Sequence, residues 1–162
     1  MNAEERVVAA ARVRIIGIGS PFSGDDAGWR LARALQEADI GRGFAAGTIE
    51  IVLCAHPSHL LLGTLRGPTL AVLIDAMRTG ARPGSLRLLE LADLEKGETL
   101  TSHGFGLERT LALGRALGVL PPRVILYGIE SGPPSAMPAP AIWVAQCEEV
   151  LRAEIRHALA CA

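Results

Sequence analysis

The order of apolar runs along the chain is the feature that most restricts its fold. Short apolar runs typical of strands alternate with stretches in which apolar residues recur at helical spacing. Strands that alternate with helices form βαβ units, so the pattern predicts an α/β fold in which a mostly parallel sheet is covered by helices on both faces. The expected strands are 12–19, 48–54, 69–76, 85–91 and 123–129, and the expected helices are 26–38, 57–65, 105–117 and 141–159.

Two segments are expected to depart from the buried-strand and helix patterns. Polar residues alternate with apolar ones over 85–91, which is typical of a strand at the edge of a sheet. The tract 132–140, with sequence GPPSAMPAP, holds four prolines and is not expected to form regular structure.

Length and composition point to one folded unit. The chain has 162 residues, of which 49% are hydrophobic and 20% charged. Because domains commonly contain about 100–200 residues, we expect a single domain over 1–162. The net charge of -1 leaves no basic surface for nucleic acid or anionic lipid. No apolar run approaches the roughly 18 residues of a membrane span, and no secretory signal is evident. We therefore expect a cytoplasmic protein, and we expect it to be a monomer.

The three cysteines suggest no cross-linked framework. Cys54, Cys147 and Cys161 are an odd number, widely spaced and never in a C-x-x-C pair, so neither disulfides nor a structural zinc site is predicted. We expect two buried thiols and a third near the frayed end of the chain, none of them reactive.

The loop after the first expected strand carries two adjacent carboxylates. It lacks the third glycine of a G-x-G-x-x-G dinucleotide motif, because Phe22 stands at that position. Asp25 and Asp26 lie where the next helix begins, and two negative charges there repel a phosphate and attract a cation. One of the two is expected to be the helix N-cap, which leaves the other to be explained.

Two further side chains stand where expected strands or helices meet loops. Asp75 lies near the end of the mainly apolar run TLAVLIDA, and His103 precedes the expected helix 105–117. Because ligands bind beyond the carboxyl ends of parallel strands, Asp26, Asp75 and His103 can share one crevice. Two carboxylates and an imidazole suit a divalent ion such as zinc or nickel. The alternative is that each has only a capping, loop or surface role.

The other histidines are weaker candidates. His56 and His59 are three residues apart and could form a ligand pair, but no third ligand is near them in the sequence. His157 lies in the last expected helix and is expected to be exposed near its end.

Four pieces of the chain, in order between about residues 13 and 129, resemble motifs of the NiFe-hydrogenase maturation proteases. These endopeptidases trim the C-terminal tail of the hydrogenase large subunit. The pieces are GIGSPFSGDDAG, LIDAMRTGARPGSL, SHGFGLERTLALGRALG and PPRVILYGIE. The resemblance implies a three-layer α/β/α fold with a twisted, mainly parallel sheet of about five strands.

The resemblance also implies a site and a substrate. Asp26, Asp75 and His103 match the family's metal ligands, which also serve catalysis, while Asp25 is expected to cap the helix. The implied substrate and partner is a large-subunit precursor that brings its own nickel, and no organic cofactor is implied. The chain departs from the family pattern at Ser20, at Trp29 and in the proline tract.

Two other functions remain open at this stage. One is a nickel-sensing assembly factor that binds the large subunit without cutting it, through the same three side chains. The other, which the adjacent aspartates disfavour, is a nucleotide-binding α/β domain. No G-x-S-x-G motif of a serine hydrolase is present.

Overall fold

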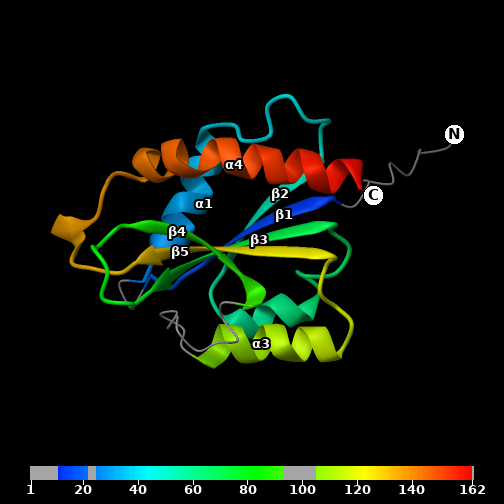
Figure 1. The fold of residues 1–162 in the computed structure, drawn as a ribbon, viewed down its shortest axis with the longest axis horizontal. Coiled ribbons are helices and arrows are strands. Elements are labelled where there is room, and N and C mark those ends of the chain that lie inside the picture. Colours follow the sequence, from blue (N-terminus) through cyan, green and yellow to red (C-terminus); the bar gives the residue numbers. More distant parts are fainter. Residues whose placement is uncertain (1–10, 22–24, 93–104, 162) are drawn as a thin grey trace, which may run out of the picture.

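A computed structural model describes residues 11–21, 25–92 and 105–161 and shows a five-stranded sheet at the centre of the molecule (Figure 1). The strand order is β2-β1-β3-β5-β4. β4 is antiparallel to β5, whereas every other neighbouring pair is parallel. The strands are β1 (Val13–Ile18), β2 (Ile49–Cys54), β3 (Leu70–Met77), β4 (Leu86–Glu90) and β5 (Arg123–Glu130).

Helices cover both faces of the sheet, as the α/β/α prediction requires. In Figure 1, α1 (Ala27–Glu37) and α4 (Pro140–Ala160) lie above the sheet, and α3 (Phe105–Ala116) lies below it. The 3-10 helix η1 (Pro57–Leu62) packs beside α3. Each face of the sheet contributes its own apolar cluster.

β3 is the strand that divides the two clusters. All of its residues are buried, because it lies between β1 and β5 in a sheet covered on both faces. Alternate side chains point to opposite faces: Ile74 and Ala76 belong to the cluster under α1 and α4, and Leu73 and Met77 belong to the cluster over η1 and α3.

The start of α1 is pressed against the carboxyl ends of two strands. A Cβ atom on Gly28 would lie 2.2 Å from the carbonyl oxygen of Ile18 and 2.4 Å from that of Ile74. Only glycine fits this close approach. It brings the loop before α1 to the edge of the sheet where β1 and β3 end.

The observed elements confirm most of the expected boundaries. All five strands and three of the helices agree within one residue at each end, and the edge position of β4 is confirmed. Two expectations were wrong in detail. The segment 57–65 is a shorter 3-10 helix, and the proline tract includes the 3-10 turn η2 (Pro134–Ala136). α4 also takes Pro140 into its first turn, where its missing N–H costs nothing.

The described cysteines are free, with Cys54 and Cys147 buried and Cys161 exposed, as predicted. No helix among the described residues is both long and apolar enough to span a membrane.

Candidate active site

Asp26 occupies the N-cap position of α1. Its backbone carbonyl accepts a hydrogen bond from the N–H of Arg30 at 2.9 Å, which begins the helix. Among the described residues, its carboxylate makes no capping hydrogen bond. The side chain instead lines a pocket of about 210 Å³ together with Ala76, Ser131 and Met137. The carboxylate is thus available for another role.

Asp25 does not cap the helix, so that expectation was wrong. The chain folds back on itself here, and the N–H of Ser20 donates to the carbonyl of Asp25 at 3.2 Å. The pairing places Asp25 one residue before the cap. Its buried carboxylate lies 3.7 Å from the guanidinium of Arg78, just after β3. This ion pair links the loop before α1 to the end of the central strand.

Asp75 is fully buried near the end of β3. Its Oδ1 atom accepts a hydrogen bond from the N–H of Ala76 at 2.8 Å. Side chains alternate along a strand, so the carboxylate lies on the face opposite Ala76, with Leu73 and Met77, toward η1 and α3. A carboxylate in this position has lost most of its hydration and gains from a nearby cation.

Cys54 ends β2 at the same edge of the sheet. Burial, the largest cause, raises the pKa of its thiol, hydrogen bonding with the backbone of His56 lowers it, and the negative charge of Asp75 raises it further. The thiol also donates a hydrogen bond to the carbonyl of His56 at 3.0 Å. The Nε1 atom of Trp29 donates to the carbonyl of Cys54 at 3.1 Å. The indole of Trp29 therefore links α1 to the end of β2.

The structure places two of the three predicted site residues, Asp26 and Asp75, at one edge of the sheet, but it does not bring their side chains together. Asp26 and Asp75 both lie at the carboxyl edge of the sheet, but their side chains approach it from different layers. His103 lies outside the described residues. Within the described ranges, no cluster of three His, Cys, Asp or Glu side chains is close enough to hold a metal ion. The three-residue site therefore stays a prediction.

Glu130 is a buried carboxylate at this edge whose role the sequence analysis missed. It ends β5, and it accepts hydrogen bonds from the N–H and hydroxyl of Thr79 and from the N–H of Gly80. These bonds hold the turn after β3 against the end of β5. Like Asp75, Glu130 follows a buried apolar run, which was the available signal.

A protein-family model described as hydrogenase maturation protease matches residues 55–139. The chain belongs to this family. The matched segment contains Asp75 and His103, whereas Asp26 lies before it. The enzyme is accordingly a hydrogenase maturation endopeptidase, which processes the precursor of the hydrogenase large subunit.

Solved structures share the fold over most of the chain. The hydrogenase maturating endopeptidase HybD from Escherichia coli is 22% identical with a TM-score of 0.67, over 90% of this chain and 93% of that one. The maturation protease HybD from Thermococcus kodakarensis is 20% identical with a TM-score of 0.66, over 89% and 99%. HycI from the same organism is 21% identical with a TM-score of 0.57, over 93% of each chain. No curated protein gives a significant match.

Proposed function

We propose that this maturation protease recognises the nickel ion already bound in its precursor through Asp26, Asp75 and His103. The ion is part of the substrate and brings the peptide bond to be cut to the edge of the sheet. Carboxylate and imidazole groups are suitable ligands for such a borderline divalent ion. A precursor without nickel would lack the bridge between substrate and enzyme, so it would be left uncut.

The observation that carries this proposal is the state of Asp26. A helix N-cap aspartate ordinarily accepts a hydrogen bond from the first turn, whereas this carboxylate makes none among the described residues and lines a pocket. Ala76, which lines the same pocket, directly follows Asp75. Two carboxylates near the same carboxyl edge of the sheet make the local electrostatic potential more negative, which favours binding of a cation.

The proposed ligands would act mainly by positioning. Holding the ion at three points fixes the precursor chain relative to the enzyme, which lowers the entropic cost of reaching the transition state. A divalent ion supplies Lewis acidity toward the carbonyl of the peptide bond or toward water.

The test compares nickel-loaded and nickel-free precursor as substrates. Mass spectrometry of the large subunit follows loss of the C-terminal extension. We expect the wild-type enzyme to cut only the nickel-loaded form, and Asp26→Asn, Asp75→Asn and His103→Ala to cut neither. Asp25→Asn is the matched control, because Asp25 pairs with Arg78 rather than with the proposed ion. It is expected to retain processing.

The same variants are examined by thermal unfolding. Asp26→Asn is expected to melt like the wild type, because its carboxylate makes no capping bond in the described structure. Cleavage that persists in Asp26→Asn and His103→Ala would refute the metal role. Loss of folding in both would show that these side chains are structural.

A further inference from the structure

An apolar strip that the described residues leave exposed runs between β4 and α4. Leu88 of β4 is 42% exposed, and Ile142 and Val150 of α4 are 49% and 45% exposed. Ile142, Gln146 and Val150 recur every four residues, so they share one side of the helix. This arrangement leaves apolar side chains of a strand and of a helix facing the same open space.

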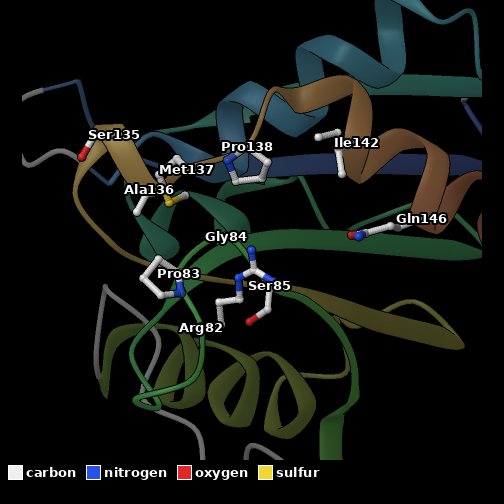
Figure 2. A pocket seen from close by; sticks show the side chains of 10 residues that line it. All are labelled: Arg82, Pro83, Gly84, Ser85, Ser135, Ala136, Met137, Pro138, Ile142 and Gln146. Carbon is white, nitrogen blue, oxygen red and sulfur yellow. The ribbon is translucent and has the colours of Figure 1, made fainter.

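Two adjoining hollows lie along this strip, with volumes of about 440 and 380 Å³. They share Ser85 and Gln146, and we call them together the β4–α4 groove. Figure 2 shows the first hollow, in which the loop before β4 faces the η2 segment and Ile142 and Gln146 continue along α4. The lining of the groove includes Arg82, Leu86, Leu88, Tyr127, Gln146 and Val150.

The groove begins at the candidate active site. Met137 lines both the first hollow and the pocket that contains Asp26. Because β4 is antiparallel to β5, its first residue, Leu86, pairs with Ile129 near the carboxyl end of β5. The rest of β4 leads away from that end. A chain that passes through the site can therefore continue along the groove.

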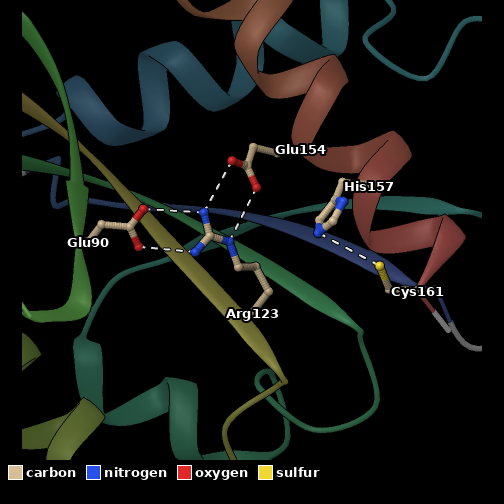
Figure 3. A network of polar contacts seen from close by, with 5 residues as sticks. All are labelled: Glu90, Arg123, Glu154, His157 and Cys161. Carbon is tan, nitrogen blue, oxygen red and sulfur yellow. Dashed lines mark hydrogen bonds and ion pairs between the residues drawn. The ribbon is translucent and has the colours of Figure 1, made fainter.

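Polar contacts join α4 to β4, or to the loop before it, at both ends of the groove. At the end near the site, the Nε1 atom of Trp143 donates to the carbonyl of Gly84 at 2.7 Å. At the far end, Arg123 forms ion pairs with Glu90 of β4 and Glu154 of α4, each at 3.2 Å (Figure 3). α4 is thus held at a fixed place beside β4, and the groove exists before any ligand enters.

The lining indicates the chemistry of the occupant. Of the described residues that line the groove, only Arg82 is charged, and it lies at the end near the site. The hydroxyl of Tyr127, which is 3% exposed, has no hydrogen-bond partner among the described residues. In the described part of the chain β4 pairs with β5 alone, so its outer backbone groups can pair with another strand.

We propose that the β4–α4 groove binds an extended, largely apolar segment of the precursor, next to the peptide bond to be cut, as a sixth strand on β4. Main-chain hydrogen bonds to a sheet edge supply affinity, and alternate side chains fit the adjacent hollows. The inference rests on the proposed function, because the groove leads from the pocket assigned there to nickel recognition.

Steady-state cleavage of the nickel-loaded precursor tests the groove. The variants are Leu88→Glu on β4 and Val150→Glu on α4. The matched control is Leu113→Glu on α3, since Leu113 is a helix residue on the opposite face of the sheet and is 49% exposed. We expect KM to rise on the order of tenfold in both groove variants, with kcat nearly unchanged. The control is expected to behave like the wild type.

Unchanged KM values in both groove variants would overturn the proposal, provided that they melt like the wild type. A dimer in light scattering that Val150→Glu dissociates would also overturn it, because a second copy of the chain would then occupy the edge. Equal cleavage of nickel-loaded and nickel-free precursor would refute the nickel recognition alone. The KM comparison would still decide whether the groove holds the substrate.

Discussion

Trp143 and Gly84 are joined by a buried hydrogen bond in which the indole Nε1 donates to the glycine carbonyl at 2.7 Å. Trp143 is fully buried, and the guanidinium of Arg30 lies 5.3 Å from the centre of its ring. The bond ties the first turns of α4 to the loop before β4. It therefore sets the position of the helix over one end of the β4–α4 groove.

Trp143→Phe is expected to lower the free energy of unfolding by about 2–4 kcal/mol. Part of the loss is the cost of a carbonyl left buried without its donor, and part is the cavity left by the smaller ring. Urea denaturation measures the change. Trp29→Phe is the control, because Trp29 also donates to a backbone carbonyl but is only partly buried. Trp29→Phe should lose less stability than Trp143→Phe. Equal losses in the two variants would show that the buried bond of Trp143 has no special weight.

Gly84→Ala is expected to be more damaging than Gly80→Ala. Both glycines have positive φ angles, +77° and +81° respectively, so alanine costs about 1–2 kcal/mol at either position. At Gly84, however, the new Cβ would lie 2.2 Å from the Cδ atom of Pro138, whereas no described atom lies within 4 Å of it at Gly80.

The added collision should cost Gly84→Ala a further 1–3 kcal/mol, about the range for overpacking. The difference between the two midpoints of urea denaturation isolates this contribution. If both variants lost the same stability, the contact between the loop before β4 and Pro138 would have no energetic weight.

The alternation of strands and helices could be predicted from the sequence because it is a local property. Residues 70–74, with sequence LAVLI, are all apolar, which is typical of a strand buried on both faces, and β3 lies at the centre of the sheet. The polar alternation of 85–91 likewise predicted an edge strand, because one side of such a strand is exposed to water.

The details of the site depend on packing and could not be predicted in the same way. The sequence has two adjacent aspartates, and only the pairing of Ser20 with Asp25 decides that Asp26 takes the cap position. Glu130 obtains its partners from the turn after β3, 50 and 51 residues away along the chain. No local pattern reports such a contact.

The thiol of Cys147 should make stability depend on alkaline pH. Burial, the largest cause, raises its pKa from 9.0 to about 11, although a backbone hydrogen bond opposes the shift. The unfolded chain therefore loses this proton at lower pH than the folded protein does. The resulting stabilisation is complete below about pH 9 and is lost as the pH rises toward 11.

Urea denaturation between pH 8 and pH 11 should show this loss, of about 1–2 kcal/mol. Cys147→Ala removes the titrating thiol, so its stability should fall less steeply over the same range. Cys161→Ala is the control, because it removes a thiol that is exposed rather than buried. A parallel decline in Cys147→Ala and the wild type would contradict the assignment.

Tyr127→Phe separates the stability of the fold from binding in the β4–α4 groove. The hydroxyl is buried without a partner among the described residues, and burial raises the pKa of this side chain, with smaller contributions from Cys147 and Glu154. Removing the hydroxyl should therefore leave stability unchanged or raise it by up to about 1 kcal/mol. If an extended segment of the precursor hydrogen-bonds to this hydroxyl, KM should rise severalfold while kcat stays nearly constant.

Tyr127→Leu is the comparison, since a lost ring should cost about 2–4 kcal/mol through the cavity it leaves. A clear loss of stability in Tyr127→Phe, with KM unchanged, would show that the hydroxyl serves the fold rather than the substrate.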